Sequence, residues 1–342
     1  MIREPVDVGP NTVILGIETS CDETAAAVVM GGDDVVSSVV SSQIELHATF
    51  GGVVPEIASR AHLELLNPVI SRAIVEAGVE ERRIDAVAAT VGPGLIGALL
   101  VGVSAAKALA LAWDVPFVGV NHLEAHLYAA LLDDPSMELP VVVLLVSGGH
   151  TLLVEMRELG RYRLLGQTID DAAGEAFDKV ARFLGLGYPG GPAIEQAATS
   201  GDPAAIDFPR ALRHEGLDVS FSGLKTAVMN HVRKHPDATT ADVAASFQAA
   251  VVDVLVLKAR RAADLIGARG LALGGGVAAN SVLREAILGA CADDGRRGYL
   301  PSRAMCTDNA AMIAAAGWHR LRLDGPTPLD AGAVPNLRLT AE

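Results

Sequence analysis

One order of predicted elements occurs twice along this chain, and this repeat constrains the fold more than any other feature. In the first half, a strand over 13–18 is followed by a polar turn, two more strands and a helix over 55–78. In the second half, an aliphatic strand over 141–146 is followed by a turn, two more strands and a helix over 171–186. An internal duplication of this size predicts two α/β units of the same plan. We expect a ligand site at the junction of the two.

Composition favours a soluble, cytoplasmic protein. The chain has 342 residues, enough for roughly two domains, and half of them are apolar, which excludes intrinsic disorder. The longest apolar stretch, 86–106, is long enough to span a membrane as a helix. Gly92-Pro93-Gly94 interrupts it, so we interpret it as a buried strand, a turn and a core helix. Three cysteines form no complete disulfide framework, and residues 1–10 show no signal-peptide pattern. We therefore expect a reducing compartment and no membrane.

Two histidines at helical spacing are the sharpest candidate for a metal site. His122 and His126 lie four residues apart, so both imidazoles can face one ion. Glu124 does not occupy the position of the glutamate in the His-Glu-x-x-His zinc proteases, so the general base of that class is missing. Asp308, which opens another predicted helix, is a candidate third ligand. Two histidines and one carboxylate suit Fe(II), Zn or Mn. A pair of surface or capping histidines is the alternative.

Two glycine-containing turns follow buried strands and are candidates for binding phosphate. In Ser147-Gly148-Gly149 the glycines let backbone N–H groups approach a ligand without a Cβ in the way. Gly274–Asn280 follows a strand and opens a helix, where Asn280 could bind a base or ribose, or merely cap the helix. The matching turn of the first half carries Asp22, which could hold a metal-bound water or orient a phosphate. An ordinary hairpin turn is the alternative for the Ser147–Gly149 turn and for the turn that carries Asp22.

An acidic segment opens the helix predicted over 171–186. Asp170 and Asp171 are explained by complementation of the helix dipole and by capping. Asp178 lies at least a full turn further in, and it could accept a hydrogen bond from a ribose or substrate hydroxyl. The segment 188–192, Tyr-Pro-Gly-Gly-Pro, is predicted to be a rigid, exposed turn. A simple helix stop is the alternative.

Together these motifs closely resemble the TsaD family, the tRNA N6-adenosine threonylcarbamoyltransferases that were once labelled glycoproteases. The resemblance runs from about Val13 to Gly317, and so many long motifs in one order make it highly specific. The segments that carry it are Ile17–Thr24, Gly52–His62, His122–His126, Leu145–Thr151, Asp170–Lys179, Ser220–Thr226 and Gly274–Asn280.

The resemblance implies a fold and a reaction. The fold is the duplicated actin/sugar-kinase/Hsp70 type, with two α/β lobes around a nucleotide cleft. One lobe is expected over 1–139 with a returning segment over 309–342, and the other over 140–308. The reaction moves a threonylcarbamoyl group from threonylcarbamoyl-AMP to N6 of adenosine 37 in tRNAs that read codons beginning with A, releasing AMP.

The resemblance also implies the residues of the site, motif by motif. One divalent metal per subunit, Fe²⁺ first and Zn²⁺ or Mn²⁺ otherwise, is expected on His122, His126 and Asp308. An adenine nucleotide, threonylcarbamoyl-AMP or ATP, is expected on nine residues of the second half. These are Leu145, Val146, Ser147, Gly148, Gly149, Asp178, Gly191, Glu195 and Asn280. Removal of the N6 proton by Asp22 is a hypothesis that rests only on its place in the first turn.

The resemblance further implies partners, namely a smaller paralogue (TsaB), an ATPase (TsaE), the tRNA substrate, and the enzyme TsaC that makes the adenylate. A net charge of −14 is unusual for a tRNA-binding chain, because phosphate contacts need Lys and Arg. We therefore expect the isolated chain to bind tRNA weakly and its partners to complete the tRNA surface. The rival functions are a metal-dependent glycoprotease, a kinase or ATPase of the same fold, and a non-catalytic scaffold.

Overall fold

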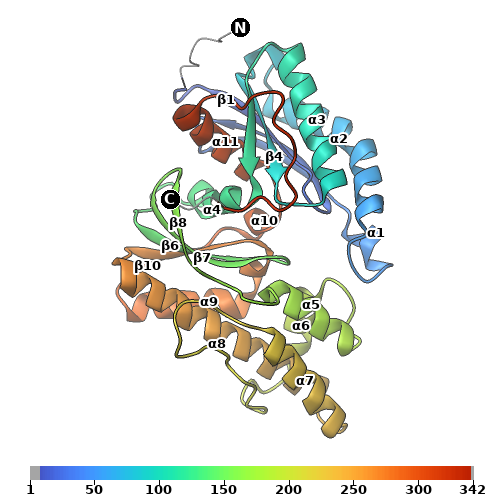
Figure 1. Cartoon of the computed structure of the whole chain (residues 1–342), viewed down its shortest axis with the longest axis vertical. Helices are drawn as coiled ribbons and strands as arrows, with labels where there is room; N and C mark the ends of the chain where they lie inside the picture. Colours follow the sequence, from blue (N-terminus) through green and yellow to red (C-terminus); the bar gives the residue numbers. More distant parts are fainter. Residues whose placement is uncertain (1–7, 340–342) are drawn as a thin grey trace. The chain divides into compact units, whose positions relative to one another are not determined.

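The computed structural model describes residues 8–339, which divide into two compact units (Figure 1). The first contains residues 8–135 together with 307–339, and the second contains residues 136–306. The chain therefore leaves the first unit once and returns to it after the second is complete. The ends of the predicted first lobe, residues 1–7 and 340–342, lie outside the described residues.

The first unit is built on a five-stranded mixed sheet with the strand order β3-β2-β1-β4-β5. Its strands are β1 (Val13–Glu18), β2 (Glu23–Met30), β3 (Asp34–Ser42), β4 (Ala86–Gly92) and β5 (Phe117–Asn121). The first three strands form an antiparallel meander, and β4 and β5 run parallel to β1. All six residues of β1 are buried, as expected of a central strand covered on both faces.

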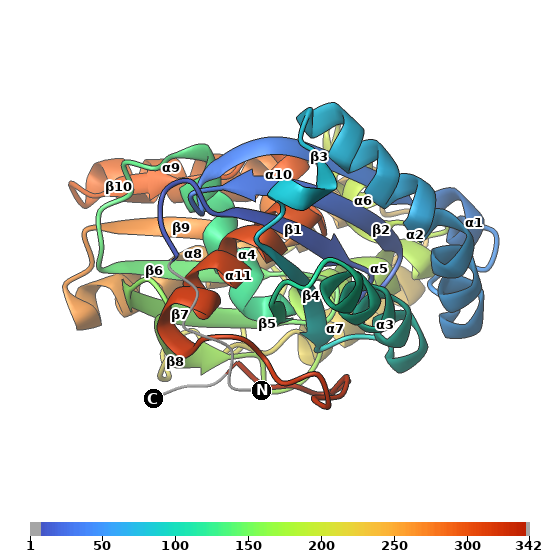
Figure 2. The same ribbon diagram turned by 90° about the horizontal axis from the view of Figure 1, so that it is seen from above.

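Helices cover both faces of this sheet (Figure 2). The covering helices are α2 (Pro55–Ala77), α3 (Ile96–Ala112), α4 (His122–Asp133) and α11 (Ala310–Asp324). The short helix α1 (Ile44–Ala48) and a 3₁₀ turn at Glu81–Arg83 lie in the connections between β3, α2 and β4. Because side chains alternate along a strand, Leu15 points to one face and Gly16 to the other. Leu15 belongs to the core with α2 and α3. A Cβ on Gly16 would lie 2.3 Å from the Ala310 carbonyl oxygen, so α11 approaches the opposite face closely.

The second unit repeats this plan. Its strands are β6 (Val141–Val146), β7 (Thr151–Glu158), β8 (Arg161–Gln167), β9 (Gly270–Gly274) and β10 (Arg297–Tyr299). The order is β10-β9-β6-β7-β8, with β6, β7 and β8 antiparallel and β9 and β10 parallel to β6. Traced from the meander end, both sheets have the same order and the same strand directions. The predicted duplication, and with it the actin/sugar-kinase/Hsp70 fold class, is confirmed.

The helices of the second unit include one long helix that packs against three of the others. The helices are α5 (Ala173–Phe183), α6 (Gly190–Ala198), α7 (Ser222–Lys234), α8 (Thr240–Ile266), the 3₁₀ turn η2 (Gly276–Ala279), α9 (Ser281–Asp293) and α10 (Arg303–Cys306). Among the described helices, α8 is the one long and apolar enough to cross a membrane. Most of its apolar residues are buried in this unit's own core, as in the central helix of a globular domain.

Two predictions of local structure have definite outcomes. The apolar stretch over 86–106 is β4, a turn and the start of α3, as expected. The exposed turn predicted over 188–192 is wrong in its second half, because Gly190 is buried and begins α6. A Cβ on Gly190 would lie 2.5 Å from Cα of Asp178, so this glycine lets the start of α6 contact α5. Glycine and proline here mark a close approach of two helices as well as a helix stop.

His319 on α11 makes the stability of the first unit dependent on pH. Its ring stacks on Tyr128 at a centroid distance of 5.0 Å and meets Trp318 edge-on at 4.9 Å. Burial, assisted by the nearby charge of Arg322, lowers the pKa of His319 to about 4. The unfolded chain, in which a histidine titrates near its ordinary pKa of about 6.5, then binds more protons than the folded chain between these two values. Stability from this group is complete above about pH 6.5 and is lost as the pH falls toward 4.

We therefore expect the free energy of unfolding to fall by roughly 2 kcal/mol between about pH 7.5 and pH 5 through His319 alone. His319→Phe keeps an aromatic ring on Tyr128 but cannot take up a proton. Urea unfolding at both pH values should show a smaller pH dependence in this variant than in the wild type. An identical pH dependence in the two proteins would show that another group is responsible.

Candidate metal centre and nucleotide site

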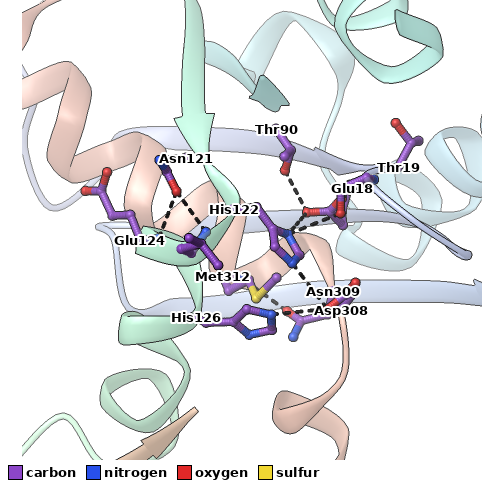
Figure 3. Close-up of polar contacts among 12 residues, drawn as sticks. Glu18, Thr19, Thr90, Asn121, His122, Glu124, His126, Asp308, Asn309 and Met312 are labelled. Carbon is purple, nitrogen blue, oxygen red and sulfur yellow. Dashed lines mark hydrogen bonds and ion pairs between the residues drawn. The ribbon is translucent and has the colours of Figure 1, made fainter. Parts of the chain in front are cut away.

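The first unit brings together the three predicted metal ligands (Figure 3). The Nε2 atom of His126 lies 3.1 Å from Oδ1 of Asp308, and Nε2 of His122 lies 3.6 Å from the same oxygen. One potential ligand atom from each residue lies within 4.8 Å of the other two. The two imidazole rings meet edge-on, with centroids 4.7 Å apart. The three donor atoms therefore converge although Asp308 lies 182 residues after His126 in sequence.

Two side-chain caps place these ligands. Asn121 ends β5 and begins α4 at once, because its Oδ1 accepts hydrogen bonds from the backbone N–H groups of Leu123 and Glu124 at 2.9 and 3.3 Å. His122 is consequently the first residue of α4, and His126 follows one turn later on the same face. On the returning segment, Oδ1 of Asn309 accepts from Met312 N at 3.1 Å and starts α11 directly after Asp308.

Glu124 is turned away from the three ligands. Its carboxylate accepts two hydrogen bonds from Nε of Arg320, at 2.8 and 3.0 Å, and the side chain is buried. A general base of a zinc protease must reach a metal-bound water, and a carboxylate held by an arginine elsewhere does not. The position of Glu124 in the structure therefore argues against the peptidase alternative, as did its position in the sequence.

The electrostatic field around the ligands favours positive charge. Burial alone would lower the pKa of His122, but the charges of Asp308 and Glu18 and a hydrogen bond to Glu18 raise it to about 9. Burial, with the charges of Asp308 and Asp22, raises the pKa of Glu23 to about 10, so Glu23 is protonated at neutral pH. A cation beside Asp308 relieves this repulsion between carboxylates.

The residues present fit a divalent metal. Two imidazole nitrogens and one carboxylate oxygen are ligands that Fe²⁺, Zn²⁺ and Mn²⁺ accept. In addition, Nδ1 of His126 is buried without a hydrogen-bond partner among residues 8–339. Buried polar atoms in a purely structural pair are normally satisfied. The incompletely satisfied ring and the excess of carboxylates both distinguish this cluster from a pair of capping histidines.

Asp22 and its neighbours lie in the β1–β2 turn of the same unit. Asp22 is buried, and its side chain is hydrogen-bonded to that of Glu23. Next to it, burial and the charges of Asp22 and Asp308 raise the pKa of the Cys21 thiol. Because the thiolate is the reactive form of cysteine, Cys21 is not a nucleophile at neutral pH.

The second unit places the predicted nucleotide residues in two groups. Leu145 and Val146 are fully buried in β6, so neither presents its side chain to a ligand. Ser147 closes the following turn, with its N–H donating to the His150 carbonyl at 2.8 Å and its Oγ accepting from His150 N at 3.2 Å. The N–H groups of Gly148 and Gly149 find no acceptor in the described part of the chain.

The second group is joined by α6. Gly190 N, at the start of α6, donates to Oδ1 of Asp178 at 2.7 Å. Glu195, further along α6, accepts from Ser281 N at 3.0 Å and from Nδ2 of Asn280 at 3.3 Å. Asn280 caps α9 through its Oδ1, which accepts from Leu283 N at 3.0 Å, so the capping alternative is correct for that atom. The hydrogen bond to Asp178 thus joins the start of α6 to α5, and the hydrogen bonds to Glu195 join α6 to the start of α9. Gly191 lies on α6 between these two connections.

Asp170 and Asp171 do not have the role that the sequence predicted. The helix α5 begins at Ala173, and Ala172 precedes it without a side-chain cap. Asp170 instead accepts from the backbone of Phe221 at 2.9 Å, and Asp171 pairs with Lys225 at 2.7 Å. These carboxylates attach the start of α7 to the loop before α5. Since the partners lie some 50 residues further on, helix-dipole reasoning could not find them.

Sequence reasoning also missed Glu18, the last residue of β1. Its carboxylate is completely buried and accepts a hydrogen bond from Nδ1 of His122 at 3.0 Å (Figure 3). The available signal was a single acidic residue that ends the otherwise uncharged strand Val-Ile-Leu-Gly-Ile-Glu.

Comparisons with solved structures show the fold. Component A of (R)-2-hydroxyglutaryl-CoA dehydratase from Acidaminococcus fermentans aligns over 91% of this chain and 100% of its own, with a TM-score of 0.55 and 16% identity. HypF from T. kodakarensis aligns over 94% of this chain and 49% of its own, with a TM-score of 0.64 and 16% identity.

Comparisons of sequence go further. The family model for TsaD, tRNA N6-adenosine threonylcarbamoyltransferase, matches residues 34–315. The protein of that name from Symbiobacterium thermophilum is 57% identical, over 96% of this chain and 97% of its own length. Those from Geobacter sp. (strain M21) and Anaeromyxobacter dehalogenans are 55% and 56% identical, over 94% and 96% of this chain and 95% and 100% of their own lengths. This chain therefore belongs to the TsaD family of tRNA N6-adenosine threonylcarbamoyltransferases.

Proposed function

We propose that this protein transfers the threonylcarbamoyl group of threonylcarbamoyl-AMP to N6 of adenosine 37 in tRNAs that read codons beginning with A. The observation that carries the proposal is the 55–57% identity to threonylcarbamoyltransferases over 94–96% of the chain. The chain also keeps the three candidate metal ligands and both groups of nucleotide residues. A non-catalytic scaffold would need neither set.

We place the adenylate on the second unit. Gly148, Gly149 and Gly191 each have open space where a Cβ would be, and none has a positive φ. Nothing in the protein's own backbone or packing therefore requires glycine at these positions. Close approach of a phosphate or ribose to the backbone gives a reason for all three. Asp178, Glu195 and Asn280 supply polar atoms beside Gly191 for the nucleoside.

We place one divalent metal on His122, His126 and Asp308, with Fe²⁺ as the first candidate and Zn²⁺ or Mn²⁺ as alternatives. When bound, such an ion supplies Lewis acidity toward the oxygens of the donor. The protein's own contribution is positional, since α4 and the residue before α11 hold the three ligands in fixed places.

The reaction needs no covalent intermediate on the protein. The donor is a mixed carbamic–phosphoric anhydride, so AMP is a good leaving group. The bond from N6 of adenine to the carbonyl carbon forms, the bond from that carbon to the phosphate oxygen breaks, and N6 loses a proton. Asp22 is our candidate for accepting that proton, and the protonated Glu23 beside it donates a hydrogen bond to it. Free N–H groups at Gly148 and Gly149 can stabilise charge on the phosphate.

Partners complete the proposed system in the cytoplasm. We propose that a TsaB paralogue and a TsaE ATPase act together with this chain, and that TsaC supplies the adenylate. The net charge of −14 supports this arrangement, because an acidic chain alone attracts polyanionic tRNA poorly. Salt-sensitive, tight binding of tRNA by the isolated chain would contradict it.

A transfer assay tests the proposed function. Purified protein is combined with TsaB, TsaE, threonylcarbamoyl-AMP labelled in the threonyl group, and an unmodified tRNA that carries adenosine 37. We expect label in this tRNA and none in a matched tRNA with guanosine at position 37. His122→Ala/His126→Ala should lose the label. Label in the tRNA with that variant would support the transferase function and show that the two histidines are not required for transfer. No label with the wild-type protein would reject the function.

A further inference from the structure

Glu18 is a completely buried carboxylate that neither the metal ligands nor the nucleotide residues account for. It ends β1, and every other residue of that strand is an aliphatic residue or glycine. Burying a carboxylate costs free energy unless hydrogen bonds and an opposite charge compensate for it. A residue of this kind in the centre of a sheet needs a specific partner, and the structure provides one.

Both carboxylate oxygens of Glu18 are used. Oε1 accepts a hydrogen bond from Ser20 N at 2.5 Å. Oε2 accepts from Oγ1 of Thr90 at 2.6 Å and from Nδ1 of His122 at 3.0 Å (Figure 3). Ser20 and Thr90 therefore fix the carboxylate from two sides, and the remaining direction of Oε2 points at the imidazole.

Nδ1 of His122 also lies 3.2 Å from Oγ of Ser20, but the Glu18 carboxylate is closer, at 3.0 Å, and can only accept a hydrogen bond. The contact with Glu18 therefore determines what the other nitrogen of His122 can do. A neutral imidazole carries its proton on one nitrogen and a lone pair on the other. With a proton held on Nδ1 by Glu18, Nε2, which faces Oδ1 of Asp308 at 3.6 Å, is the nitrogen whose lone pair binds a metal when the metal displaces its proton. A carboxylate behind a histidine ligand also fixes the ring orientation and makes the ligand more basic.

We propose that Glu18 is a positioning residue that holds His122 in the Nδ1–H form, so that Nε2 is presented as a metal ligand beside His126 and Asp308. The inference rests on the metal site of the proposed function. The two histidines are not equivalent in this respect, because Nδ1 of His126 has no partner among residues 8–339. His122 is the pre-oriented ligand, and Glu18 acts through it alone.

Binding of Co²⁺ to metal-free protein tests the proposal without reference to transfer activity. Cobalt substitutes for Fe²⁺ and Zn²⁺ at such sites, and its visible absorption reports the geometry of the ligands. Glu18→Gln has one acceptor oxygen where glutamate has two, so it cannot keep all three hydrogen bonds. We expect roughly 10- to 100-fold weaker Co²⁺ binding and an altered absorption spectrum. Circular dichroism and thermal melting of the metal-free variant establish that it is folded.

Two further variants separate positioning from general stability. Glu155→Gln is the matched control, because Glu155 is another buried glutamate in a strand, paired with Arg163 at 2.6 Å in the second unit. It should lower the melting temperature and leave Co²⁺ binding unchanged. Thr90→Val removes one donor to Glu18 and leaves every ligand intact, so a smaller weakening of Co²⁺ binding, roughly two- to fivefold, is expected.

The outcomes are distinguishable. Folded Glu18→Gln with the wild-type Co²⁺ affinity and spectrum overturns the proposal. If Glu18→Gln does not fold, Thr90→Val decides, and unchanged Co²⁺ binding in it overturns the proposal. Wild-type protein that binds no Co²⁺, or binds it equally well as His122→Ala, rejects the metal site itself. Transfer activity, measured separately, then decides whether the proposed function survives that result.

Discussion

Asp308→Ala is expected to remove the bound metal and to slow threonylcarbamoyl transfer by roughly 10³-fold, which corresponds to about 4 kcal/mol. Asp308 is the one carboxylate of the candidate ligand set, and a single oxygen, Oδ1, faces both histidines at 3.1 and 3.6 Å. Without it, two neutral imidazoles remain, and they do not hold a divalent ion firmly. Metal content after dialysis and single-turnover transfer with saturating partners measure the two effects.

Glu124→Gln is the control for this experiment. Glu124 is on the same helix as both histidines, is buried, and pairs with Arg320 at 2.8 Å. We expect it to lower the melting temperature and to keep metal content and transfer. Loss of metal without loss of transfer in Asp308→Ala would show that the ion is structural or adventitious. Loss of transfer in Glu124→Gln with metal retained would revive the possibility that this carboxylate acts in catalysis.

Gly149→Val is expected to weaken adenine-nucleotide binding by roughly 10²-fold or more while the melting temperature stays within a few degrees of the wild type. Nothing lies within 4 Å of the place where a Cβ on Gly149 would be, and its φ is not in the positive range. The substitution therefore has room in the protein, and the added branched side chain takes the space that a phosphate would use. Calorimetric titration with AMP or ATP and a thermal melt measure the two quantities.

Substitutions at two other glycines serve as controls for Gly149→Val. Gly289→Ala, on the exposed side of α9, also has nothing within 4 Å and should leave nucleotide binding unchanged while raising stability slightly. Gly174→Ala should weaken nucleotide binding and lower the melting temperature. The added Cβ would lie 2.5 Å from the Ser147 carbonyl oxygen and push the turn away from α5. Gly149→Val that melts early and binds nucleotide normally would mean that this glycine serves the fold alone.

The repeat of elements was predictable because it depends on local patterns. Aliphatic strands such as 13–18 and 141–146 are short, apolar and bounded by turns, and both are found with the predicted bounds. The pairing of Asp170 with the start of α7 and the role of Gly190 at the α5–α6 contact were not predictable. They depend on tertiary neighbours, and a sequence pattern describes only neighbours within a turn or two.

The candidate metal site was likewise predictable only where its residues are close in sequence. The spacing of His122 and His126 indicates a shared helix face by itself. Asp308 was a candidate by its residue type, but its convergence with the histidines was implied only by resemblance to a family, since 182 residues separate it from His126. Glu18 was part of a quoted motif but was given no role, because a sequence does not show which carboxylate lies behind which imidazole. The structure adds those contacts.

The return of the chain to its first unit has a consequence for the order in which the protein matures on the ribosome. Residues 136–306 are synthesised completely before Asp308 and α11 exist. Until then β1 lacks the helix that packs against Gly16, and His122 and His126 lack their carboxylate. Domains generally fold as they emerge, the N-terminal one first. Here the later unit can finish first, and the three candidate metal ligands can come together only after the last segment is made.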